Sequence, residues 1–196
     1  EGESQFERLK RLERSCEVHH KLREYFAKKG RTFLSTAFDS DSLGFLVDDL
    51  GLTTLKLPSG EITNGPLLLE HAQTGCDLIL STGMATLGEV EEALGVIAFG
   101  FVNGKNSSVQ PSREAFQASY FSEQGQALLK EKVTVLHCTT EYPAPADEIN
   151  LNAMLTMQRA FGLKTGYSDH SEGITVPIAA SAMGATLIEK HFTLDK

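Results

Sequence analysis

Short apolar runs rich in β-branched residues alternate along this chain with longer stretches of helical periodicity. Many of the helical stretches are followed by a glycine just past their last periodic residue, as at Gly162 and Gly184. This alternation predicts repeated strand–helix units and therefore a parallel sheet covered by helices. The predicted strands are residues 32–38, 54–58, 78–82, 133–139, 165–169 and 186–192.

The helical stretches between these strands have the length of ordinary globular helices. Two more helices are predicted upstream, one running from its cap at Ser15 to Lys29 and an earlier amphipathic one marked by Phe6, Leu9 and Leu12. The chain is therefore expected to open on helices. The helices predicted between strands are residues 42–50, 66–74, 87–99, 151–161 and 174–183.

Polar side chains at the strand ends distinguish two kinds of parallel sheet. A doubly wound sheet gathers such groups only near its switch point, whereas a barrel directs every strand end to one mouth. Here every predicted strand ends in small polar or charged residues, which predicts a (β/α)8 TIM-type barrel. A whole barrel has eight strands in about 250 residues, so the six predicted strands indicate an incomplete one. The polar residues are Ser35, Thr36, Lys56, Ser59, Glu61, Ser81, Thr82, Thr139, Thr140, Tyr142, Ser168, His170, Glu189 and His191.

One segment interrupts the spacing of the units. Between residues 100 and 132 the chain has a flexible turn at 103–108 and then a polar, helical stretch at 112–130. We interpret it as an insertion in an exterior loop, with a lid or a subunit contact as the alternatives.

Composition excludes several classes of protein. The formal net charge of −8 and the lack of a long Lys/Arg cluster argue against a nucleic-acid partner. No apolar run approaches the length of a membrane span, and the first residues do not resemble a signal peptide. Three widely spaced cysteines without a C-x-x-C pair suit a reducing compartment and no structural zinc. We expect one soluble, cytoplasmic domain over residues 1–196.

Two histidines close successive strand-like runs. His170 ends Gly-Tyr-Ser-Asp-His and His191 follows Ile-Glu-Lys. Imidazole is a common ligand of first-row transition ions, and matching positions on neighbouring strands favour one shared metal site with open coordination positions. The alternative is that either histidine is merely packed or exposed.

Several strings, in order, resemble those of the sialic acid (N-acetylneuraminate) synthase family. The likeness covers nearly the whole chain, including residues 33–36 and Asp39, and its specificity comes from independent strings in register. The strings are LKLPSGE (55–61), LSTGM (80–84), HCTTEYPAP (137–145), GYSDH (166–170) and IEKHFT (188–193).

This resemblance implies the condensation of phosphoenolpyruvate with N-acetylmannosamine or a related six-carbon amino sugar, giving a nine-carbon acid and phosphate. Manganese or another divalent metal would bind His170 and His191 and polarise the sugar's aldehyde. The implied catalytic residues are His170, His191 and Glu61. The implied contacts to phosphoenolpyruvate are Thr36, Lys56, Ser59 and Ser168, and those to the sugar are Glu61 and Tyr142. Thr140 is a further implied substrate-binding residue, and it stands where many members have asparagine, which leaves the choice of substrate open.

Family members also carry two preceding strands with a catalytic glutamate, and a C-terminal antifreeze-like domain that reaches the partner's site in a homodimer. Neither is present in these residues, so weak turnover is expected from this chain alone. A metal-dependent aldolase, another phosphoenolpyruvate-condensing barrel and a non-catalytic metal- or sugar-phosphate-binding fragment stay open as alternatives. So do ordinary structural roles: Lys56 as a surface lysine, Glu61 as a helix cap, Tyr142 as a packed aromatic and Met84 as a core residue.

Overall fold

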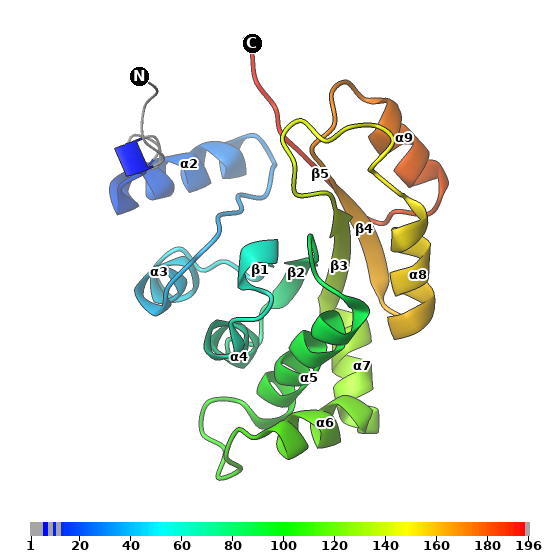
Figure 1. Ribbon diagram of the computed structural model, residues 1–196. Helices are drawn as coiled ribbons and strands as arrows, with labels where there is room; N and C mark the ends of the chain where they lie inside the picture. Colours follow the sequence, from blue (N-terminus) through cyan, green and yellow to red (C-terminus); the bar gives the residue numbers. More distant parts are fainter. Residues whose placement is uncertain (1–5, 8–9, 11–12, 195–196) are drawn as a thin grey trace.

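In the computed structural model, the described residues are 6, 7, 10 and 13–194. The expected amphipathic helix at the start falls largely outside them, since Leu9 and Leu12 are not described. Five parallel strands form one sheet in the order β1-β2-β3-β4-β5, so each strand pairs with its neighbour in sequence (Figure 1). The strands are β1 Thr54–Leu57, β2 Asp77–Ser81, β3 Val133–Cys138, β4 Lys164–Asp169 and β5 Ile188–Lys190.

The predicted strand at residues 32–38 is wrong. This segment has no regular secondary structure, and no strand among the described residues pairs with it. Its apolar, β-branched composition suits an extended chain, but a strand exists only where a neighbour accepts its backbone hydrogen bonds. The described sheet therefore has five strands instead of six.

The predicted strand at residues 186–192 is shorter in the structure. Its ladder covers only Ile188–Lys190, although Thr186 N donates to the Thr165 carbonyl and Tyr167 N donates to the Leu187 carbonyl, each at 2.9 Å. Both histidines of the predicted metal site therefore lie just past the last rungs of the sheet.

The helices follow the predicted pattern closely. Ser15 caps α2, where its Oγ accepts from Val18 N, and the predicted helix 42–50 divides into α3 and a π-helical turn, η1. In the described residues no helix combines the length and apolar character that a membrane crossing requires. The helical elements are α2 Cys16–Lys28, α3 Ser40–Gly44, η1 Phe45–Asp49, the 3-10 turn η2 Ser59–Glu61, α4 Gly65–Gln73, α5 Leu87–Asn103, α6 Arg113–Phe121, α7 Glu123–Lys132, α8 Asn152–Phe161 and α9 Thr175–Ala182.

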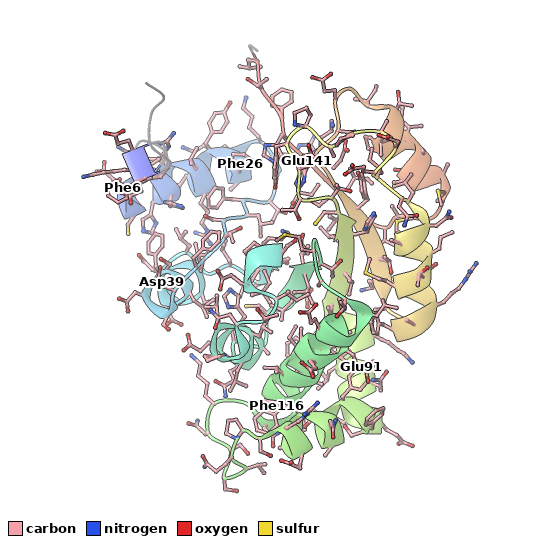
Figure 2. All side chains as sticks on the ribbon, viewed as in Figure 1. Phe6, Phe26, Asp39, Glu91, Phe116 and Glu141 are labelled. Atoms are coloured by element: carbon pink, nitrogen blue, oxygen red, sulfur yellow. The ribbon has the colours of Figure 1, made fainter. Side chains whose placement is uncertain are left out.

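The segment interpreted as an insertion forms the end of α5 and the helices α6 and α7. Phe116 of α6, labelled in Figure 2, packs edge-on against Phe99 of α5 with ring centroids 5.2 Å apart. Ser122 is extended, so α6 ends there, and its Oγ accepts from Gly125 N to begin α7. Figure 1 shows these helices at the end of the molecule farthest from β5.

The two faces of the sheet differ in chemistry. Leu55, Leu57, Leu78 and Leu80 are almost fully buried on the outer face against α4 and α5. Each such side chain contributes roughly 1.5–3 kcal/mol by leaving water. Because side chains alternate along a strand, the intervening positions face the inside of the sheet. Those positions carry Lys56, Ile79, Ser81, Cys138, Ser168 and Glu189.

The sheet is curled into part of a barrel. In a flat five-stranded sheet, β1 and β5 would lie roughly 19 Å apart, since neighbouring strands are separated by about 4.8 Å. Lys56 Nζ on β1 nevertheless lies 3.4 Å from Glu189 Oε2 on β5. Only a strongly curved sheet brings its two edge strands this close, so the predicted incomplete TIM-type barrel is confirmed.

Met84 departs from its expected role in the core. It follows β2 with φ of +65° and is 79% exposed. Gly83 and Met84 together turn the chain from the mouth of the sheet toward α5.

Candidate active site

His170 and His191 follow directly after β4 and β5. Asp169 and Lys190 are the last paired residues of these strands, so the two histidines are neighbours in the next position. Their ring centroids are 5.7 Å apart, with the rings nearly perpendicular at 79°. The structure therefore brings together the pair that the sequence predicted.

The orientation of His170 is set by the end of β3. Its Nδ1 lies 2.6 Å from the carbonyl oxygen of Thr139. Because a carbonyl only accepts, Nδ1 carries the proton in this contact, which leaves Nε2 as the ring nitrogen that can bind a metal. A histidine whose second ring nitrogen donates to a carbonyl is the usual arrangement at a metal ligand.

The two imidazoles fit one divalent cation. With metal–nitrogen bonds of about 2.1 Å, two imidazoles that share an ion have centroids within roughly 6.5 Å of each other. No third histidine, cysteine, aspartate or glutamate joins them in a ready-made cluster among the described residues. An ion held here would therefore take its remaining ligands from water and substrate oxygens.

Tyr142 adds an aromatic wall to the histidine pair. Its ring centroid lies 4.0 Å from that of His170 and 5.6 Å from that of His191. The loop that carries Tyr142 is held to the end of β4 by a hydrogen bond, in which Ala144 N donates to the His170 carbonyl at 3.0 Å. Burial raises the pKa of the Tyr142 phenol, although the side chain is 62% exposed. These three rings border a pocket of about 470 Å³ that Glu172 and Phe192 also line.

A second group of polar side chains lies on the inner face. Lys56 is only 7% exposed, and its ammonium lies 3.4 Å from Glu189 Oε2. The other oxygen of Glu189 accepts a hydrogen bond from Ser168 Oγ at 2.6 Å. Residues from β1, β4 and β5 thus meet around one carboxylate, which excludes an ordinary surface role for Lys56.

Ser59 and Thr140 meet at Gly83. Ser59 Oγ accepts from Gly83 N at 2.8 Å and lies 3.2 Å from Cys138 Sγ. A methyl group on Gly83 would lie 2.3 Å from Thr140 Oγ1, so the absence of a side chain permits this close approach. Ser81, on the adjacent strand end, has a buried hydroxyl with no hydrogen-bond partner among the described atoms. That hydroxyl is available to a ligand.

Two predicted site residues stand apart. Glu61 accepts a hydrogen bond from Asn64 Nδ2 at 2.7 Å. Asn64, and not Glu61 as the structural alternative had it, caps α4. Thr36 lies half-buried in the irregular segment before α3. Within the described part of the chain, no hydrogen bond or ion pair joins either residue to Lys56 or Ser168.

The structure also adds residues to which the sequence assigned no role. Glu189 bridges Lys56 and Ser168, while Asp169 and Lys190 form an ion pair beside the histidines. Burial raises the pKa of Asp169, but hydrogen bonds from Lys190 and Ser171 outweigh it and hold this pKa below its usual value. The sequence position of Glu189 could have indicated its role. Glu189 is two residues before His191 and therefore lies on the same inward face of β5.

Comparison with known proteins identifies relatives of this chain. The NeuB family model matches residues 1–196. The N,N'-diacetyllegionaminic acid synthase of Campylobacter jejuni is 45% identical over 194 residues, which cover 99% of this chain and 50% of that protein. The N,N'-diacetyllegionaminic acid synthase of Legionella pneumophila is 43% identical, covering 100% of this chain and 48% of that protein. The chain thus spans about half the length of these curated relatives.

A solved structure agrees in fold. The crystal structure of N-acetylneuraminic acid (sialic acid) synthetase from Leptospira borgpetersenii, in complex with citrate, superposes with a TM-score of 0.74 at 32% identity. The match covers 93% of this chain and 54% of that one. The curled sheet and its helices are therefore shared with a synthase structure.

Proposed function

This chain belongs to the NeuB family, and from that premise we propose that it condenses phosphoenolpyruvate with an N-acetylated six-carbon amino sugar. The new carbon–carbon bond joins the methylene carbon of phosphoenolpyruvate to the sugar's aldehyde carbon, whose oxygen takes up a proton. Water then adds at the carbon that carries the phosphate ester and loses a proton, and inorganic phosphate leaves. The observation that carries the proposal is the contact between Lys56 and Glu189, because it places the inner polar group beside the strand that leads to His191.

The inner group suits the anionic substrate. The buried ammonium of Lys56 and the hydroxyls of Ser59 and Ser168 supply charge-assisted hydrogen bonds to phosphate and carboxylate oxygens. The buried hydroxyl of Ser81 adds a free donor on the same face. Low exposure strengthens these interactions, since less water competes for them.

The histidine pair suits the aldehyde end of the sugar. His170 and His191 would hold a manganese or other divalent ion, which when bound supplies polarisation of the carbonyl. Thr139 fixes the protonated nitrogen of His170 and so directs the other toward the pocket. Tyr142, whose ring centroid lies 4.0 Å from that of His170, offers an aromatic surface and a hydroxyl to the sugar ring.

The acceptor we favour is a six-carbon sugar with two N-acetyl groups. The chain is 45% and 43% identical to two N,N'-diacetyllegionaminic acid synthases, against 32% to the sialic acid synthetase of known structure. Thr140 stands where many members of the family have asparagine, so a hydroxyl replaces an amide there and the contacts to substrate change. N-Acetylmannosamine is the alternative acceptor.

Calorimetric titration with phosphoenolpyruvate in the presence of manganese tests the anion site. We expect Lys56→Met to weaken binding at least tenfold, through loss of a charged hydrogen bond of about 1.5–3 kcal/mol. Lys164→Met is the matched control, since Lys164 sits on β4 of the same sheet but at the opposite end of the barrel, where it bonds the Glu131 carbonyl. Equal binding by both variants would contradict the proposed anion site.

Phosphate release distinguishes the reaction classes. We expect release only when phosphoenolpyruvate and an amino sugar are both present, and faster with the di-N-acetylated sugar than with N-acetylmannosamine. Release without any sugar would indicate a phosphatase. A carbon–carbon bond formed without phosphoenolpyruvate would instead support an aldolase. Binding is the primary measurement, because the chain spans about half the length of its curated relatives.

A further inference from the structure

Lys190 bonds both residues that flank His170. Its ammonium donates to the carboxylate of Asp169 and, at 2.8 Å, to the carbonyl of Ser171. The side chain of Asp169 is fully buried, and its other oxygen accepts from Ser171 N at 2.9 Å and from Ser171 Oγ at 2.6 Å. One side chain from β5 thus bonds the residues on either side of His170, through the carboxylate of Asp169 and the backbone carbonyl of Ser171. We call this arrangement the clamp.

That clamp comes from the residue next to His191. Asp169 and Lys190 are the last partners in the β4–β5 ladder, so the histidines that follow them lie beyond its last paired residues. Side-chain bonds reinforce the link between the two strands at this point. They tie the chain around His170 directly to the residue that precedes His191.

We propose that Asp169 and Lys190 are positioning residues, which hold His170 and His191 at the separation that one divalent cation requires. This inference rests on the metal site of the proposed function. Two simpler roles compete with it. The pair could serve only the stability of the sheet, or its charges could act on the ion through space.

An effect of charge and an effect of geometry would change the metal affinity of Lys190→Met in opposite directions. A positive charge beside the site repels a divalent cation, so Lys190→Met would tighten metal binding if only charge mattered. If the clamp positions His170, the same substitution weakens binding. The double variant Asp169→Asn/Lys190→Met removes one charge of each sign, so it removes the clamp without changing the net charge.

Titration calorimetry of the 196-residue chain with manganese(II) provides the measurement, with circular dichroism to establish folding. Second-layer substitutions at metal sites typically weaken affinity about 10- to 100-fold, and we expect a loss of that size in both variants. If Lys190→Met unfolds because it leaves a buried carboxylate unpaired, the double variant, which leaves none, carries the test.

The chain contains a matched control pair. Lys132 Nζ lies 3.5 Å from Asp77 Oδ1 and donates to the Gly75 carbonyl at 3.1 Å, a similar pattern of bonds at the opposite end of the sheet around a more exposed carboxylate. We expect Asp77→Asn/Lys132→Met to bind manganese like the parent. A general effect of lost sheet stability would instead weaken binding in both double variants alike.

The outcomes separate this inference from the metal site itself. Loss of binding in His170→Ala/His191→Ala, together with parental affinity in Asp169→Asn/Lys190→Met, overturns the clamp and supports the metal site. A parent chain that binds no manganese overturns both. Weakened binding in the Asp169/Lys190 variants alone supports both.

Discussion

The hydroxyl of Ser168 donates to Glu189 Oε1 at 2.6 Å, while Glu189 Oε2 lies 3.4 Å from the ammonium of Lys56. One carboxylate therefore engages two groups that the proposed function assigns to an anionic substrate. The substrate and Glu189 compete for the same donors. Binding of phosphoenolpyruvate must loosen at least one of these contacts or proceed beside a negative charge.

The first prediction concerns this competition. Glu189→Gln removes a like charge next to the bound anion, so we expect phosphoenolpyruvate to bind at least roughly fivefold more tightly, or about 1 kcal/mol. The free energy of unfolding should fall, because the buried ammonium of Lys56 loses its charged partner. Calorimetry and urea titration give the two values. Glu172→Gln, on the rim of the histidine pocket, is the control for net charge, and weaker binding by Glu189→Gln would refute the prediction.

The second prediction concerns Gly83. An added methyl group would meet Thr140 Oγ1 at 2.3 Å, Cys138 Sγ at 2.9 Å and Ser59 Oγ at 3.0 Å. We expect Gly83→Ala to lower the unfolding free energy by about 1–3 kcal/mol and to weaken binding of phosphoenolpyruvate. Gly88→Ala is the control, since the nearest atom there is 3.9 Å away. Equal stability of the two variants in urea would count against the close approach.

The third prediction concerns the packing of α4 on α5. A methyl group on Gly100 would lie 2.5 Å from Ala72 Cβ and 3.3 Å from the Leu69 carbonyl. Gly100→Ala is expected to cost about 1–3 kcal/mol despite the better helix propensity of alanine. Thermal unfolding followed by circular dichroism measures this loss. Manganese affinity should be retained, because this contact lies on the outer face of the sheet.

The fourth prediction concerns pH. Burial lowers the pKa of His71, whose Nδ1 donates to the Leu67 carbonyl and whose Nε2 is buried without a partner among the described atoms. The unfolded chain therefore binds a proton at a higher pH than the folded one. The contribution of His71 to the free energy of unfolding is complete above about pH 6.5. It is lost as the pH falls through the folded-state pKa of this ring.

Urea titrations at pH 7.5 and pH 5.5 measure this effect. We expect the midpoint of unfolding to fall at the lower pH, and the fall to shrink in His71→Leu, which removes the titrating ring. His137, whose pKa burial also lowers, contributes in the same direction and should leave a residual slope. An unchanged slope in His71→Leu would show that other groups cause the acid sensitivity.

The fold was largely readable from local patterns. Glycine and serine signals placed the ends of helices: Ser15 caps α2, and Gly162 takes the left-handed conformation, φ +64°, at the end of α8. The polar residues at strand ends indicated a barrel mouth. The prediction of a strand at residues 32–38 was wrong because local composition indicates only a preference for extended backbone. A strand also needs a neighbouring strand to pair with, which composition does not report.

The sequence by itself determined the strand–helix units, the two faces of each strand and the position of His170 and His191 one step past neighbouring strand ends. These features depend on periodicity and on contacts a few residues apart. Only the tertiary structure decided that the sheet curls until Lys56 meets Glu189, and that Lys190 grips both neighbours of His170. Those contacts join residues 133 and about 20 positions apart, which no local pattern encodes because they arise from how the whole sheet bends.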